Sequence, residues 1–73
     1  MPQRFSPYRL KALREDAGLT RTAVAYAAGR SEQTVWLWER GRVTPPVSVL
    51  EQVSVLVGCS VSDFFEEVEV VDA

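Results

Sequence analysis

The stretch that decides the fold runs from Thr20 to Arg40 and reads T-R-T-A-V-A-Y-A-A-G-R-S-E-Q-T-V-W-L-W-E-R. Four apolar positions in it are spaced three or four residues apart, in two pairs: Val24 with Ala28, and Val35 with Trp38. Such spacing places side chains on one face of a helix. The stretch therefore predicts two short helices that pack against each other through these pairs.

Two small residues make the connection between these helices possible. Gly29 can adopt the positive φ that a tight turn requires, which a residue with a Cβ resists. Ala25 leaves room for the second helix to approach the first. The pattern predicts a helix-turn-helix arrangement, in which the second helix commonly lies in the major groove of DNA.

Capping residues divide the rest of the chain into further helices. The expected helix starts are the N-caps Ser6, Thr20 and Ser31, position 47 after the loop Thr44-Pro45-Pro46, and the Ser60–Asp63 capping box. The predicted fold class is all-α, a compact five-helix domain over residues 1–66. Residues 67–73 form an acidic tail that is expected to be frayed, and residues 69–73 of it could alternatively add a strand across a dimer.

Size and composition indicate one small globular domain. The chain has 73 residues, of which 47% are hydrophobic and 25% charged. No apolar run approaches the length of a membrane span, and no hydrophobic segment typical of a secretory signal follows the N-terminus. Cys59 is the single cysteine and is expected to be a buried structural thiol. These features predict a cytoplasmic protein.

The residue types argue against an enzyme and against a metal site. The chain has no histidine, which is the commonest general base and zinc ligand. One cysteine without histidine cannot assemble a zinc site, and no Gly-rich phosphate loop is present. We therefore expect no catalysis, no metal and no cofactor.

The charge is divided unevenly along the chain. The net charge is −2, but all eight Lys and Arg residues lie in residues 1–44, which contain four acids and so carry 8 − 4 = +4. Residues 45–73 contain six acids and no base, and so carry −6. This division predicts that the first part faces a polyanion and that the second part faces away from it.

With these features together, the chain resembles the Cro/CI-like (xenobiotic-response-element type) helix-turn-helix family. The match runs without a gap from Leu10 to Phe65. The residues that carry it are Leu10, Leu13-Arg14, Gly18-Leu19-Thr20, Val24-Ala25, Gly29, Ser31, Thr34-Val35, Trp38-Glu39-Arg40-Gly41-Arg42, Pro45, Leu50, Gly58, Ser60 and Asp63-Phe64-Phe65.

The resemblance implies roles for several polar residues. Arg14 and Glu39 match positions that form an ion pair between the first helix and the recognition helix. Where the family usually carries a phosphate-binding glutamine, this chain has Arg21, whose charged fork is a stronger phosphate ligand. The full set expected at the DNA backbone is Thr20, Arg21, Arg40, Arg42 and Thr44. Such residues position a protein on DNA and do not read its sequence.

The base-reading residues are expected on the outward face of the third helix, and they are Glu32, Gln33, Trp36 and Leu37. Gln33 can pair with both major-groove atoms of adenine. Glu32 can accept from a cytosine amino group, or can serve only as a favourable first-turn acid on the helix dipole.

Trp36 and Leu37 depart from the family pattern, which generally has polar or small residues at these positions. Three roles are open for them: packing on thymine methyl groups, forming a protein interface, or, for Leu37, packing into the core.

Taken together, these features predict a sequence-specific regulator of transcription that binds double-stranded DNA. We expect a small repressor of phage or bacterial type, which binds a near-palindromic operator as a homodimer and acts by occupying it. The alternative is a helix-turn-helix fold reused as a protein-binding module, such as an antirepressor, an antitoxin or a host-protein inhibitor, with Trp36 and Leu37 as its anchor.

Overall fold

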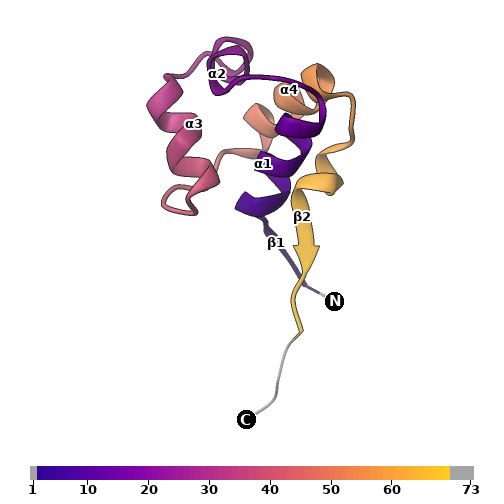
Figure 1. Cartoon of the computed structure of the whole chain (residues 1–73). Helices are drawn as coiled ribbons and strands as arrows, with labels where there is room; N and C mark the ends of the chain where they lie inside the picture. Colours follow the sequence, from indigo (N-terminus) through magenta and orange to yellow (C-terminus); the bar gives the residue numbers. More distant parts are fainter. Residues whose placement is uncertain (1, 70–73) are drawn as a thin grey trace.

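The computed structural model describes residues 2–69. Within them, four α-helices form the body of the molecule: α1 (Pro7–Asp16), α2 (Arg21–Ala28), α3 (Glu32–Glu39) and α4 (Val47–Val57). A short 3-10 helix, η1 (Val61–Phe64), follows α4. The strands β1 (Gln3–Phe5) and β2 (Phe65–Glu67) form a two-stranded ribbon that extends from one end of the helical body (Figure 1).

The first three helices begin where the capping residues predicted. The side-chain oxygens of Ser6, Thr20 and Ser31 each accept a hydrogen bond from the backbone N–H three residues later, over 3.2, 3.1 and 3.1 Å. Each bond satisfies one of the donors that a helix N-terminus leaves without an intrahelical partner. The expected starts of α1, α2 and α3 are therefore confirmed.

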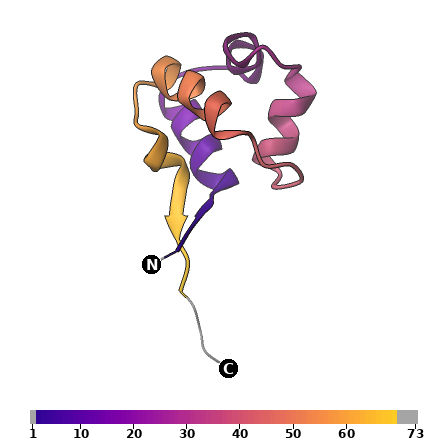
Figure 2. The same cartoon turned by 180° about the vertical axis from the view of Figure 1, so that it is seen from behind.

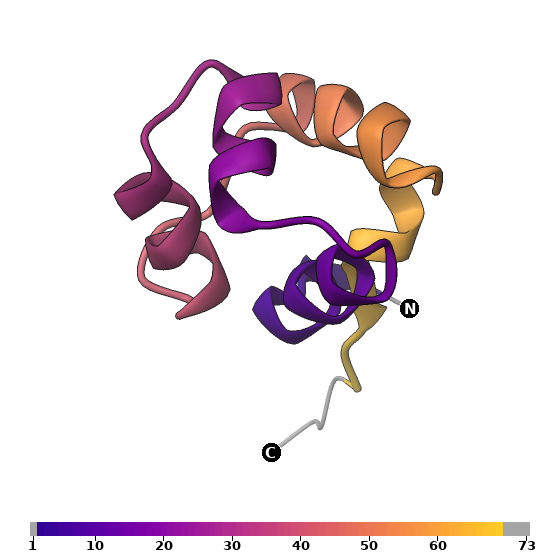
Figure 3. The ribbon, with the colours of Figure 1, turned by 45° about the horizontal axis from the view of Figure 1, so that its top comes forward.

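The turn between α2 and α3 also has the predicted geometry. Gly29 ends α2 with φ +65°. The N–H of Arg30 then donates to the carbonyl of Ala25 over 2.9 Å, which closes the turn at the helix end. Because a positive φ is costly for a residue with a Cβ, glycine at this position sets the direction in which α3 leaves α2. In Figure 3, α2 lies between α3 and α4, and it packs on both.

The prediction of a fifth α-helix is wrong. The Ser60–Asp63 capping box is present, with the Ser60 N–H donating to Asp63 Oδ2 over 3.0 Å. However, it opens only a four-residue 3-10 helix, and the chain is already extended at Phe65 (φ −112°, ψ 153°). The reason is pairing with the N-terminal segment: the carbonyl of Phe64 accepts from the Ser6 N–H over 2.8 Å, and the strand begins at the next residue.

The β1–β2 ribbon was not predicted from the sequence. The strands are antiparallel, and Arg4 lies opposite Glu66 while Phe5 lies opposite Phe65. Arg4 and Glu66 form an ion pair of 2.9 Å, and the two phenylalanine rings meet edge to face with centroids 6.3 Å apart. Figure 2 shows the ribbon from behind, with β1 leading directly into α1.

Paired backbone continues past residue 66, where the domain was expected to end. Glu67 belongs to β2, and the N–H of Val68 donates to the carbonyl of Pro2 over 2.9 Å. The partner of β2 is thus a strand of the same chain. The alternative of a strand across a dimer was placed on residues 69–73, of which residues 70–73 lie outside the described part of the chain.

The core is formed mainly by α2, α3 and α4, with Leu10 from α1 and Phe64 from η1. Its buried apolar residues are Leu10, Val24, Ala25, Ala28, Val35, Trp38, Val49, Leu50, Val53 and Phe64. The four apolar positions of the deciding stretch are all among them. Three large apolar residues of α1 and α4 lie outside this core and are exposed: Tyr8, Val47 and Leu56.

The two tryptophans of α3 provide a matched test of this core. Trp38 is 1% exposed and Trp36 is 41% exposed. We expect Trp38→Ala to lower the free energy of unfolding by about 3–5 kcal/mol, because it removes a large fully buried side chain. Trp36→Ala should cost no more than about 1 kcal/mol, mainly because the ring no longer stacks with the guanidinium of Arg40. Urea titration followed by circular dichroism measures both, and equal costs would contradict this core.

Candidate nucleic-acid interface

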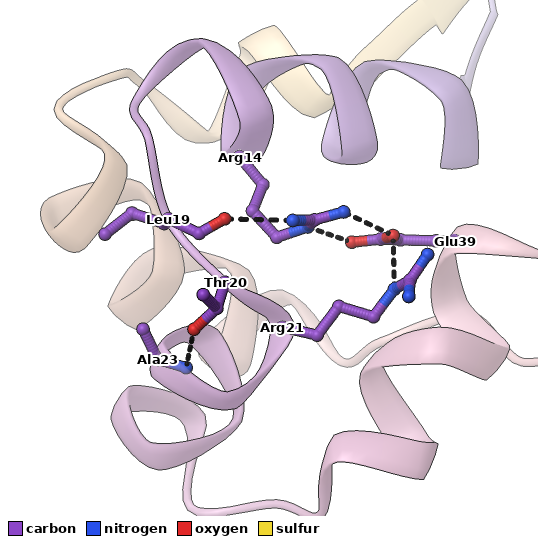
Figure 4. Close-up of polar contacts among 6 residues, drawn as sticks. All are labelled: Arg14, Leu19, Thr20, Arg21, Ala23 and Glu39. Atoms are coloured by element: carbon purple, nitrogen blue, oxygen red, sulfur yellow. Dashed lines mark hydrogen bonds and ion pairs between the residues drawn. The ribbon is translucent and has the colours of Figure 1, made fainter.

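A buried carboxylate joins three helices at the centre of the candidate interface. Glu39, at the end of α3, has a side chain that is only 2% exposed. Its two oxygens accept from Arg14 of α1, from Nε over 2.7 Å and from Nη2 over 3.1 Å. The third nitrogen of that guanidinium, Nη1, donates to the carbonyl of Leu19 over 2.9 Å (Figure 4). Arg14 and Glu39 thus form a two-pronged ion pair, the strongest geometry for this pair of groups.

Arg21 of α2 binds the same carboxylate. Its Nε donates to Glu39 Oε1 over 3.0 Å, and its side chain is 34% exposed (Figure 4). Because the contact uses Nε, the two terminal nitrogens of Arg21 keep their donors, and neither has a hydrogen-bond partner among residues 2–69. Two arginines on one carboxylate leave one net positive charge at this place.

Arg21 was expected at a DNA phosphate, and its contact with Glu39 was not predicted from the sequence. One sequence signal could have indicated this contact: arginines outnumber acids around Glu39, which faces inward. Arg40 follows Glu39 directly, and Arg14 and Arg21 lie on the two helices against which α3 packs. We refer to Arg14, Glu39 and Arg21 as the arginine–glutamate cluster.

The N-terminus of α2 lies next to this cluster. Thr20 is the N-cap, and its Oγ1 accepts from the Ala23 N–H over 3.1 Å (Figure 4). The hydroxyl hydrogen remains available to donate. The N–H groups of Arg21 and Thr22 lie in the first turn, where a helix offers no intrahelical acceptor. This end of α2 therefore presents several donors and the positive end of the helix dipole.

The outward face of α3 meets α2 in a shallow, open hollow of about 390 Å³, lined by Arg21, Glu32, Gln33 and Trp36. Three of the four expected base-reading residues thus lie together with the main expected phosphate ligand. Glu32 and Gln33 are both exposed. Thr22 Oγ1 donates to Glu32 Oε2 over 2.9 Å, so the acid is tied to α2.

The two apolar residues of α3 have different surroundings. The guanidinium of Arg40 lies over the ring of Trp36, with its carbon 5.2 Å from the ring centroid. This is a cation–π arrangement that holds both side chains at the surface. The sequence left open whether Leu37 is exposed or packs into the core. In the structure its side chain is half-buried, which is intermediate between the two.

The remaining expected phosphate ligands lie in the loop between α3 and α4. Arg42 and Thr44 are exposed there, and the Arg42 N–H donates to the carbonyl of Leu37 over 3.0 Å. That bond attaches the loop to the end of α3. Pro45, which follows, is buried and anchors the loop on the body.

The described residues hold neither a metal-ligand cluster nor a reactive thiol. Residues 2–69 contain no group of three potential metal ligands and no helix long and apolar enough to cross a membrane. Cys59 is partly buried, and burial together with the nearby charge of Asp63 raises the pKa of its thiol. The thiol therefore stays protonated at neutral pH, which makes it a poor nucleophile.

Two Arg–Glu pairs, one buried and doubly bonded and the other exposed with a single bond, test the weight of the arginine–glutamate cluster. Glu39→Gln leaves the buried guanidinium of Arg14 without a counter-charge, and we expect a loss of about 3–5 kcal/mol in the free energy of unfolding. Glu66→Gln breaks the exposed pair with Arg4 and should cost about 0–1 kcal/mol. Chemical denaturation measures both; a loss below about 1 kcal/mol in Glu39→Gln would contradict a structural role for the cluster.

Comparison with known proteins agrees with this geometry. A family model described as a helix-turn-helix domain matches residues 8–64. A search of curated protein sequences found no match. Among solved structures, a transcriptional regulator of the HTH_3 family from Vibrio cholerae is 31% identical, with a TM-score of 0.69 over 80% of this chain and 33% of that chain. The chain thus spans about a third of that regulator.

A second solved structure supports the fold alone. The hypothetical transcription factor NHTF from Neisseria is 21% identical, with a TM-score of 0.70 over 80% of this chain and 67% of that chain. The family match covers most of the sequence, from Tyr8 in α1 to Phe64 in η1. The chain therefore belongs to the helix-turn-helix domain family, with the Cro/CI-like motifs that the sequence indicated.

Proposed function

We propose that this protein binds double-stranded DNA and regulates transcription. The observation that carries the proposal is the hollow between α2 and α3, where a partly exposed arginine borders the polar residues of the recognition helix. A phosphate ligand beside base-reading side chains is what a helix inserted in the major groove requires. The Vibrio cholerae structure, which is 31% identical over the aligned region, is a transcriptional regulator by name, and this agrees with the proposal.

In this account, DNA phosphates bind at the start of α2 and at the loop after α3. Arg21 offers its two terminal nitrogens while Glu39 holds its Nε, so the fork is oriented before DNA arrives. Thr20 and the first N–H groups of α2 add neutral donors. Arg42 and Thr44 act from the loop after α3, and Arg40 from the end of that helix.

Base reading falls to the exposed residues of α3. Gln33 pairs with adenine through its amide, which has both a donor and an acceptor. Trp36 offers an apolar face for a thymine methyl group, while the Arg40 guanidinium is stacked on its ring. Glu32 and Leu37 border the same surface. The roles of Glu32, Gln33 and Trp36 follow from their exposure and chemistry, whereas the role of the half-buried Leu37 rests on its place next to Trp36 on α3.

The finer mechanism is repression by operator occupancy, in the cytoplasm. A domain of this size covers one half-site, so we propose a homodimer on a near-palindrome with half-sites one helical turn apart. In this arrangement the acidic residues 45–73 face away from the DNA. The strand β2 belongs to this part and extends from the end of the body to which β1 attaches (Figure 1). Its acid Glu66 is paired with Arg4.

A second candidate function rests on Trp36. An exposed tryptophan beside a hollow is typical of the anchor of a protein interface. In that case the chain is a protein-binding module, such as an antirepressor, an antitoxin or a host-protein inhibitor. Absence of any binding to duplex DNA at low salt would favour this second function over the first.

Salt-dependent binding of random-sequence duplex tests the phosphate contacts. We expect the Arg21→Ala, Arg42→Ala double variant to bind more weakly, and the slope of log affinity against log salt to fall by about 2, near one for each lost phosphate contact. Fluorescence anisotropy at several salt concentrations gives both quantities.

The matched control is the Arg4→Ala, Lys11→Ala double variant, which removes the same charge from β1 and α1. Its salt slope should stay near that of the wild type. If both double variants lose the same affinity and slope, binding depends on net charge alone and the assigned face is wrong.

A further inference from the structure

One hydrogen bond at the candidate interface connects two helices through exposed side chains. Thr22, in the first turn of α2, donates from Oγ1 to Oε2 of Glu32, the first residue of α3, over 2.9 Å. Both residues are exposed, and neither belongs to the core. The bond therefore contributes little to the fold, but it does limit where the Glu32 carboxylate points.

The bond leaves half of the carboxylate free. Oε2 is occupied by Thr22, whereas Oε1 has no hydrogen-bond partner among the described residues. Glu32 itself lines the hollow, together with Arg21, Gln33 and Trp36. A carboxylate is an acceptor only, so what it can recognise is a donor.

We propose that Thr22 is a positioning residue that directs Glu32 toward the amino group of a cytosine, and so sets a preference for a C·G pair at one position of the DNA site. The inference rests on the proposed function. In the major groove, cytosine presents an amino donor, whereas guanine presents only acceptors, which a carboxylate repels. Thymine presents an acceptor and a methyl group.

Adenine is the remaining competitor, and the chemistry disfavours it. Its amino donor lies beside the N7 acceptor, so a carboxylate gains one contact and faces one repulsion. Cytosine has a carbon edge beside its amino group, and this edge fits the apolar ring of Trp36 in the same hollow. A carboxylate next to an aromatic ring therefore suits cytosine best among the four bases.

A purely structural role for Glu32 makes a different prediction. As a first-turn acid, Glu32 would stabilise α3 through the helix dipole whether or not Thr22 holds it. Base preference would then be insensitive to the Thr22 hydroxyl. The two roles separate by a change that removes the hydroxyl and preserves the shape of the side chain.

The experiment begins by selecting tightly bound sites from randomised duplexes with the wild-type protein. Dissociation constants are then measured for the selected site and for its three base-pair substitutions at the preferred C·G position. The proteins are the wild type, Thr22→Val, Thr22→Ser, Glu32→Ala, and the Thr22→Val, Glu32→Ala double variant. Each preference is expressed relative to random duplex, so that any general loss of affinity cancels.

We expect the wild type and Thr22→Ser to prefer C·G about tenfold, at the lower end of the range for base contacts. Thr22→Val and Glu32→Ala should each reduce that preference to about twofold or less, and the double variant should lose no more than Glu32→Ala alone. Thermal unfolding of each variant verifies that α2 and α3 remain folded.

Three results would overturn this inference while leaving the proposed function intact. They are selected sites without a C·G preference, a C·G preference that Thr22→Val leaves unchanged, and a double variant whose loss of preference is the sum of the losses in Thr22→Val and Glu32→Ala. If the wild type binds no duplex under any salt condition, the proposed function fails, and this inference fails with it.

Discussion

The carboxylate of Glu39 is the constraint on which the arrangement of the interface depends. It is almost fully buried, and a buried carboxylate is costly unless charged donors surround it. Arg14 supplies two of those donors from α1, and Arg21 supplies one from α2. Since Glu39 is the last residue of α3, its position fixes the end of this helix relative to both neighbours. The caps and the Gly29 turn fix the other end.

The same cluster connects fold to function through Arg21. At position 21 this chain has a cation, and it is held by the acid that also holds Arg14. The second arginine does not complete the fold, because Arg14 alone already pairs with both oxygens. Its effect is to place a partly exposed guanidinium, with two unused nitrogens, at the mouth of the hollow beside Gln33 and Trp36. A structural ion pair thereby becomes part of a surface suited to phosphate.

Much of the fold was predictable because local chemistry and packing agree over residues 6–58. Ser6, Thr20 and Ser31 have the side chains that cap helices, and the apolar spacing around Gly29 has one satisfactory solution. The ribbon could not be predicted in the same way. Gln3–Phe5 and Phe65–Glu67 are three residues each, and neither is a strand without the other, although they are sixty residues apart. The capping box at Ser60 correctly predicted a helical turn, but long-range pairing ended it early.

The sequence predicted which residues of α3 belong to the candidate site, but it did not predict the hydrogen bonds that join them to α2. Exposure at helical spacing predicted that Glu32, Gln33 and Trp36 share a face, and the hollow contains all three. The bonds from Arg21 to Glu39 and from Thr22 to Glu32 join α2 to α3, so they depend on the angle between the helices. Spacing along one helix does not determine that angle. Arg40, the C-cap of α3, stacks on Trp36 four residues before it, and this contact is compatible with helical spacing.

The most direct test is to map the DNA-facing surface by nuclear magnetic resonance, titrating the ¹⁵N-labelled protein with duplex at low salt. The account predicts that backbone signals shift at the start of α2, along residues 32–37 of α3 and in the loop over residues 42–44. Signals from α4 and from the β1–β2 ribbon should remain in place. Shifts concentrated on α4 or the ribbon, or none at all, would contradict the claim that this protein binds DNA through α2 and α3.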